Sequence, residues 1–174
     1  MLIRMFGLKV LKLPCQKGRS KVQTTSELLK ILPVLVCRKG QVKENFMQEK
    51  VKQLEKHLKI DAQILDYAVV NDEKDVTLLK EEITKADVIL LYKPHLGLGD
   101  CVVKISEYRL PLILFNAEGM VNNPLDALEY IYPKEEAWVA VDHQDINDRL
   151  VALSARKKLR RTKILILNAD YPHW

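Results

Sequence analysis

The densest group of chemically capable residues lies at positions 93–100, directly after an apolar run. Its members are Lys93, His95, Gly97, Gly99 and Asp100. Backbone N–H groups at a helix start bind anions, and a lysine and a histidine would add charge and hydrogen bonds. The pattern is not G-x-G-x-x-G, because Val102 stands at the third glycine position, and no P-loop GK[ST] follows. We therefore expect a ligand-contacting loop here, and the alternative is a tight turn in which Asp100 caps the next helix.

A second polar loop begins at Asn116, after the next apolar run. Asn116 and Glu118 are its candidate ligand contacts, although a chain reversal helped by Gly119 also explains both. Further on, Asp142 stands where the last helix needs an N-cap, which favours a capping role for it.

Three carboxylates, Asp100, Glu118 and Asp142, come from loops expected at one edge of a sheet. A metal site needs several convergent ligands, and nothing in the spacing of these residues requires convergence, so we assign no metal ligand. No G-x-S-x-G signature is present, and no cysteine has a histidine beside it in the sequence. We therefore assign no catalytic residue, and we expect the cysteines to be buried free thiols.

Apolar runs and helical patterns alternate along the chain. Short apolar runs predict strands at 33–37, 62–70, 87–92, 110–115, 137–141 and 163–168. Apolar positions at helical spacing predict helices at 42–58, 74–86, 100–107, 124–131 and 142–159. This alternation implies an α/β fold with a doubly wound, mostly parallel sheet, for which we favour the flavodoxin-like order 2-1-3-4-5 over a classical Rossmann order. Ligands bind outside the carboxyl ends of such strands, where both polar loops fall.

Charge and hydropathy divide the chain into three parts: a basic segment at 1–30, an α/β domain at 31–161, and a strand with a tail at 162–174. The first part has seven basic residues and one acid, whereas the rest is close to neutral. Because the basic character does not belong to the domain, we expect no nucleic-acid partner. A later basic cluster at 156–161 suits the end of a helix, where cations complement the dipole. No run is apolar and long enough to span a membrane, and the start is a poor secretory signal, so we expect a cytoplasmic protein with no membrane partner.

The last residues read as a strand, 163–168, followed by an aromatic tail that includes Tyr171 and Trp174. Large apolar side chains are costly to leave at a free terminus. We therefore expect this strand to begin a second domain that is missing from the chain, with docking of a last strand on the sheet as the alternative.

Three segments, DVILLYKPHLGLGD (87–100), LILFNAEG (112–119) and WVAVD (138–142), resemble the N-terminal region of L-fucose isomerase-like proteins of the L-fucose/L-arabinose isomerase superfamily. The resemblance covers residues 30–174. It implies aldose–ketose isomerisation, in which a divalent metal holds the sugar oxygens while carboxylates move protons. The metal, Mn²⁺, and the catalytic acids would belong to later domains of the complete protein, so this chain would hold no cofactor itself.

That resemblance makes the chain an N-terminal domain that shapes the substrate pocket and the oligomer, inactive alone. It implies a sugar ligand, a missing C-terminal domain or partner subunit, and a homo-oligomer. The alternative is a stand-alone α/β module that binds a sugar or a small anion. An independent enzyme is the weakest hypothesis, because no catalytic constellation is visible.

Overall fold

The computed structural model describes residues 28–95, 97–115 and 136–162. The strands are β1 Leu29–Val36, β2 Ala62–Ile64, β3 Ala68–Val70, β4 Val88–Tyr92, β5 Leu112–Phe115 and β6 Ala137–Ala140. The helices are α1 Phe46–His57, α2 Glu73–Leu78, α3 Lys80–Lys85, α4 Gly99–Ser106 and α6 His143–Arg161. The expected strand at 163–168 and the expected helix at 124–131 lie outside the described residues.

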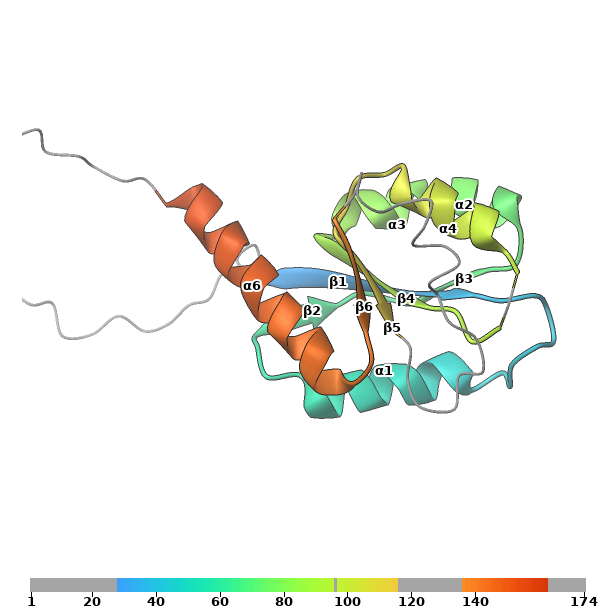
Figure 1. Cartoon of the computed structure of the whole chain (residues 1–174), viewed down its shortest axis with the longest axis horizontal. Helices are drawn as coiled ribbons and strands as arrows, with labels where there is room; N and C mark the ends of the chain where they lie inside the picture. Colours follow the sequence, from blue (N-terminus) through green and yellow to red (C-terminus); the bar gives the residue numbers. More distant parts are fainter. Residues whose placement is uncertain (1–27, 96, 116–135, 163–174) are drawn as a thin grey trace, which may run out of the picture.

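The described strands form one parallel sheet in the order β2-β1-β4-β5-β6, with β3 also paired to β1. Since β2 and β3 pair with successive parts of β1, they are two halves of a single edge strand. Counted so, the order is 2-1-3-4-5, and the predicted doubly wound, flavodoxin-like fold is confirmed. The helices lie in two layers, with α1 and α6 on one face of the sheet and α2, α3 and α4 on the other (Figure 1).

The edge strand is broken because one extra residue enters it between β2 and β3. Leu29 pairs with Ala62, but Val34 pairs with Ala68, so the register moves by one residue along the strand. Such a bulge interrupts the ladder locally. The sequence predicts one continuous strand over 62–70, because its apolar pattern does not reveal an inserted residue.

β1 begins four residues before its predicted start and carries Pro33 in its middle. The Ile31 carbonyl and the Cys37 amide both bond toward the edge strand, at Leu65 N (2.8 Å) and Val70 O (3.1 Å). Odd-numbered residues of β1 therefore turn their polar groups to that edge. The Pro33 nitrogen faces the interruption between β2 and β3, so no ladder hydrogen bond is lost there.

Alternate residues of the buried strands supply the two halves of the core. On β1, for example, Leu32, Val34 and Val36 pack under α2, α3 and α4, whereas Ile31, Leu35 and Cys37 pack under α1 and α6. Strands buried on both faces need apolar side chains at every position, which explains their continuous apolar runs.

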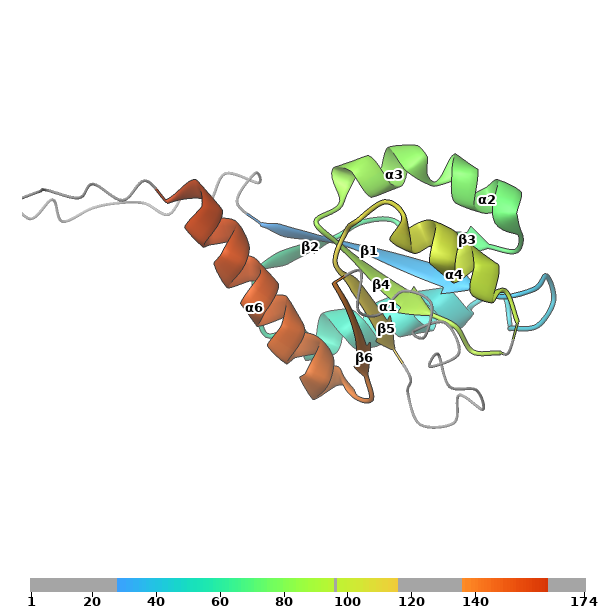
Figure 2. The same ribbon diagram turned by 45° about the horizontal axis from the view of Figure 1, so that its top comes forward.

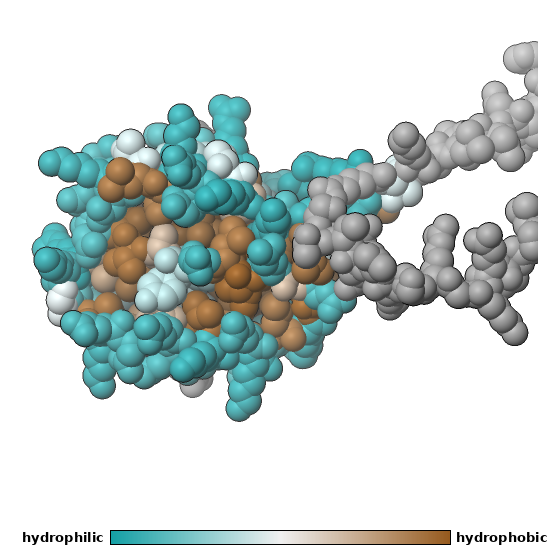
Figure 3. Space-filling model, turned by 180° about the vertical axis from the view of Figure 1, so that it is seen from behind, coloured by the Kyte–Doolittle hydropathy of each residue, from teal (hydrophilic) through white to brown (hydrophobic). Residues whose placement is uncertain are grey.

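Two surfaces of the fold remain open. Seen from behind, a band of apolar atoms lies between polar layers (Figure 3), on the side of the β2–β3 edge where Tyr67 and Val69 are 37% and 40% exposed. The far end of α6 projects past the sheet (Figures 1 and 2), and Leu159 on it is 69% exposed. Neither helix nor strand covers these surfaces within the part of the chain that the structure describes.

Candidate functional site

The loops after β1 and β4 lie side by side at the carboxyl edge of the sheet. A hydrogen bond of 3.0 Å joins His95 Nε2 to the Gln41 carbonyl. Because a carbonyl only accepts, Nε2 carries the proton. Gln41 also closes its own loop, since its Oε1 accepts from Arg38 N (2.8 Å) and its amide donates to the Arg38 carbonyl (3.1 Å). His95 thus ties the glycine loop to the loop that carries Arg38.

The glycine loop needs two left-handed residues before α4 begins. Gly97 has φ +87° and Leu98 has φ +57°, and a Cβ built on Gly97 would lie 3.7 Å from a guanidinium nitrogen of Arg38. Arg38 therefore faces the turn that leads into α4. The Arg38 guanidinium pairs with no side chain among the residues that the structure describes.

α4 starts at Gly99 without a side-chain cap. Its N-cap is Leu98, whose carbonyl accepts from Cys101 N (3.1 Å) and Val102 N (3.4 Å). The prediction that Asp100 caps this helix is wrong, because Asp100 lies inside the first turn. Apart from the adjoining residues and the backbone of α4 itself, no atom of the described residues lies within 4 Å of a Cβ built on Gly99, so these residues leave the helix start open.

Lys93 and Pro94 follow β4 and are buried, with Lys93 only 2% exposed. A lysine is almost never so buried unless it is paired. Its neighbour Tyr92 is also buried, and burial raises the pKa of its hydroxyl well above the ordinary value. The sequence places Lys93 correctly at the carboxyl edge but cannot show that its side chain turns inward.

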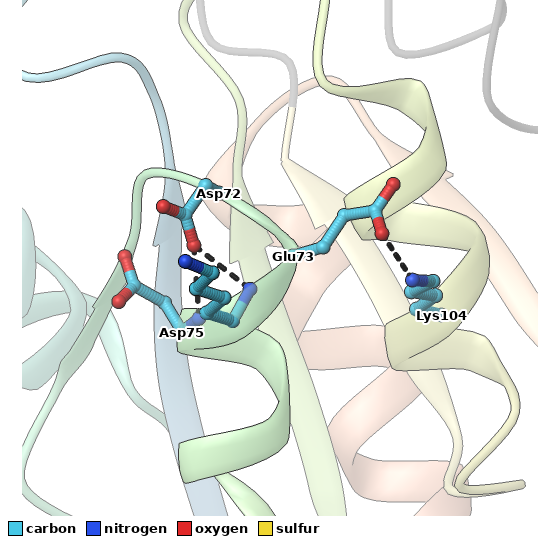
Figure 4. A network of polar contacts seen from close by, with 5 residues as sticks. Asp72, Glu73, Asp75 and Lys104 are labelled. Atoms are coloured by element: carbon cyan, nitrogen blue, oxygen red, sulfur yellow. Dashed lines mark hydrogen bonds and ion pairs between the residues drawn. The ribbon is translucent and has the colours of Figure 1, made fainter.

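The next part of this edge is acidic, and hydrogen bonds hold its carboxylates (Figure 4). Asp72 caps α2 by accepting from Lys74 N (2.8 Å) and Asp75 N (3.2 Å). Asp75 accepts from Asn71 N (2.8 Å), and this hydrogen bond lowers the pKa of its carboxyl. Glu73 pairs with Lys104 and so joins α2 to α4. These groups serve capping and helix packing.

The thiols near this edge are buried, as the sequence predicts for Cys37 and Cys101. Burial raises the pKa of both, and the charges of Glu73, Asp72 and Asp100 raise that of Cys101 further. A thiol held in its protonated form is a poor nucleophile.

At the start of α6, three rings contact one another in a row that the sequence does not predict. Asp142 caps the helix as expected, accepting from Asp145 N (2.8 Å). The ring of His143 lies 4.5 Å from that of His57 and 5.1 Å from that of Phe115, centroid to centroid. Burial, followed by the nearby charge of His57, lowers the pKa of His143. The two histidines stand 86 positions apart in the sequence, so the local sequence around one gives no sign of its contact with the other.

Of the predicted ligand contacts, Gly97 lies beside Arg38, His95 contacts Gln41 in the loop that carries Arg38, and Gly99 begins α4. Lys93 is buried at the base of the same loop, and Asp100 lies in the first turn of α4. Asn116 and Glu118 lie outside the described residues. Arg38 was not among the predicted ligand contacts, although its place directly after a strand puts it at the same edge. No group of three His, Cys, Asp or Glu residues able to hold a metal occurs over 28–95, 97–115 and 136–162.

Two hollows open on the described surface, at opposite edges of the sheet. One, of about 170 Å³, lies at the carboxyl edge and is bordered by Arg38, Lys39 and Lys43. The other, of about 280 Å³, lies at the amino edge between α6 and the starts of β4 and β5. The described helices include none that is long and apolar enough to cross a membrane.

Comparison with known proteins relates the chain to solved folds. No protein-family model and no curated protein matches it. One similar structure is a response regulator receiver domain protein of Clostridium thermocellum (TM-score 0.48, 19% identity, 76% of this chain and 99% of that one). Another is a pilus assembly-related protein of Burkholderia pseudomallei (TM-score 0.51, 11% identity, 75% of this chain and 92% of that one). A third is a 3-dehydroquinate dehydratase-like protein of Bifidobacterium longum (TM-score 0.38, 13% identity, 74% of this chain and 98% of that one). At 11% identity, the pilus assembly-related protein supports the fold alone.

These comparisons correct the resemblance drawn from the sequence. The similar structure that supports the fold is a pilus assembly-related protein, and neither a family model nor a curated protein supports an L-fucose isomerase-like chain. The predicted role as the N-terminal domain of a sugar isomerase, and its assignment to carbohydrate metabolism, are therefore wrong. The matched segments are strand-and-loop sequences of a doubly wound sheet, and unrelated proteins with such sheets contain similar runs. The other hypothesis, a small α/β binding module, is the one that the structure favours.

Proposed function

We propose that this chain is a binding module for a small phosphate-bearing molecule at the carboxyl edge of its sheet. One observation carries the proposal: the Arg38 guanidinium, with no described acid beside it, faces the turn that leads into the open, uncapped start of α4. A guanidinium and backbone N–H groups are complementary to phosphate oxygens.

The two loops support this role because hydrogen bonds hold described residues of both. The hydrogen bond between His95 and Gln41 holds them together, and Gln41 holds Arg38. A preorganised site loses less conformational freedom when it binds. His95 Nδ1 is left for a ligand, since Nε2 serves the Gln41 carbonyl. We also propose a cytoplasmic location, supported by the free thiols of Cys37 and Cys101.

Calorimetric titration of the chain with inorganic phosphate, sugar phosphates and the corresponding free sugars tests the proposal. We expect heat with the phosphorylated ligands and none with the free sugars. R38Q should weaken phosphate binding by about tenfold, the value of one charge-assisted hydrogen bond. The control K52Q removes the same charge from the exposed side of α1 and should change binding little.

A second variant separates binding from folding. G99A adds a methyl group that meets no other described residue within 4 Å, and alanine suits a helix, so the fold should keep its stability. The methyl group would stand over the helix start and obstruct the phosphate. Phosphate binding by G99A equal to that of the parent chain, or no heat with any phosphate, would overturn the proposal.

A further inference from the structure

The larger hollow, at the amino edge of the sheet, is basic and has an apolar floor. Four cations line it: Arg109 from the turn after α4, and Arg156, Lys157 and Arg160 from the far end of α6. Leu110 and Leu153 form part of the floor. We call this hollow the amino-edge cleft.

Acids among the described residues pair with two of these four cations. Lys157 Nζ lies 2.5 Å from Asp87 Oδ2 and also donates to the Leu28 carbonyl (2.7 Å). Arg156 pairs with Glu136 at 2.5 Å. The guanidinium groups of Arg109 and Arg160 pair with no acid among the described residues. The cleft therefore keeps two unmatched positive charges beside two matched ones.

Arg109 adds a second observation, since its backbone is left-handed with φ +56°. Its amide closes the turn by donating to the Ser106 carbonyl (2.9 Å). Glycine adopts this conformation with less strain than any other residue, and helices commonly end on a glycine here. An arginine at such a position aims a guanidinium into the cleft at a cost in backbone strain, as residues at functional sites often do.

We propose that the amino-edge cleft is a second binding site, separate from the carboxyl-edge site, for an organic anion with a carboxylate or phosphate head on an apolar body. Guanidinium groups pair with both heads through two parallel hydrogen bonds. The leucine floor accepts the apolar body. A volume of about 280 Å³ stands near the lower end of the range for small-molecule pockets.

The test titrates the full chain with phenyl phosphate, benzoate and inorganic phosphate, followed by calorimetry and by amide shifts in NMR spectra. The double variant R109Q/R160Q should weaken phenyl phosphate or benzoate binding at this edge by about tenfold or more. The control pair K158Q/K52Q removes two exposed lysines that do not line the cleft and should leave binding within about twofold. The two aromatic ligands decide between phosphate and carboxylate heads.

R109G makes the test independent of folding. Glycine relieves the left-handed strain, so the variant should unfold at a higher urea concentration than the parent chain while it binds the aromatic anion more weakly. Opposite changes in stability and affinity are not expected of a residue that serves only the turn. Unchanged affinity in both R109G and the double variant, or shifts confined to residues 38–43 and 97–101, would overturn the second site. Failure of R38Q to affect inorganic phosphate would bear only on the carboxyl-edge proposal.

Discussion

The two edges of the sheet are built from opposite ends of the helices, and their polar groups differ accordingly. At the carboxyl edge, helices begin, and the acids there serve their first turns: Asp72 caps α2 and Asp142 caps α6. At the amino edge, α4 and α6 end, and Arg109, Arg156 and Arg160 gather there. Both arrangements complement the helix dipoles.

The comparison shows why charge alone does not identify a site in this fold. Dipole complementarity explains the capping acids Asp72 and Asp142 at the carboxyl edge and the arginines of α6 at the amino edge. It does not explain Arg38, a cation beside a helix start, or Arg109, a non-glycine residue with a left-handed backbone. Each proposed site therefore rests on the residue that departs from the pattern of its own edge.

The largest expected effect concerns Asn147, which joins α6 to α1. Its side chain is 3% exposed, accepts from Lys59 N (2.9 Å) and donates to the carbonyls of His57 and His143 (both 2.8 Å). N147A removes the side-chain partners of Lys59 N and of the His57 carbonyl, whereas the His143 carbonyl keeps its bond within α6, and the change should lower the free energy of unfolding by roughly 2 kcal/mol. Urea unfolding followed by circular dichroism measures the loss.

The control for N147A is Q144A, one turn earlier and exposed. Gln144 bonds Lys59 Nζ at the surface, so its loss should cost less than about 0.5 kcal/mol. Similar losses of unfolding free energy in N147A and Q144A would mean that Asn147 does not anchor α6 to α1. Because α6 supplies three cations of the amino-edge cleft, some other contact would then have to hold them in place.

The second largest effect concerns Asp87, an acid at the amino edge of the sheet. Its carboxylate accepts from Lys30 N (2.8 Å) and pairs with Lys157, with side chains 30% and 15% exposed. D87N should cost about 1 kcal/mol of stability, a value reduced for solvent screening. It also removes a negative charge from the cleft, so phenyl phosphate should bind more tightly. E81Q, an exposed acid on α3, is the control, and tighter binding in E81Q as well would assign the change to net charge alone.

The order of the sheet could be predicted from the sequence because it rests on local patterns. Buried parallel strands are apolar at every position, and helices keep one apolar stripe. The strand at 87–92 and the helix at 142–159 can therefore be predicted from their own residues, without knowing what they pack against. The bulge between β2 and β3 could not be predicted, because a one-residue change of register depends on the pairing with β1. The start of β1 was predicted at Pro33, four residues too late, because whether a proline fits inside a strand also depends on the pairing with the neighbouring strand.

The place of the carboxyl-edge loops could be predicted from topology, but the contacts that their side chains make could not. Sequence reasoning places Lys93 and His95 there correctly, yet only the fold shows that Lys93 is buried and that His95 contacts Gln41, 54 positions away. The amino-edge cleft stayed hidden because Arg109 and Arg160 meet across 51 positions. The basic cluster at 156–161 indicated the end of α6, but it could not show that Arg109 lines the same cleft.

A smaller effect depends on pH and on His143, at the carboxyl end of β6. Since the folded-state pKa of His143 lies below its ordinary 6.5, protonation favours the unfolded chain. The stability from neutral His143 is complete above about pH 6.5 and is lost as the pH falls below it. H143Q should remove this slope from the urea midpoint between pH 7.5 and 5. H57Q should raise the pKa of His143 in an NMR titration, and an unchanged value would show that His57 does not contribute.

The smallest effect on stability is expected for Glu73, whose ion pair lies at the carboxyl edge and can be compared with that of Asp87 at the amino edge. Glu73 and Lys104 pair between side chains that are 53% and 44% exposed, so water screens their attraction and E73Q should not measurably move the urea midpoint. The lost carboxylate would, however, make the edge slightly more positive, and inorganic phosphate should bind about twofold more tightly at low salt, with the gain vanishing as salt rises. A loss of stability in E73Q equal to that in D87N would contradict the contrast drawn here, because the carboxyl edge would then depend on its ion pair as much as the amino edge does.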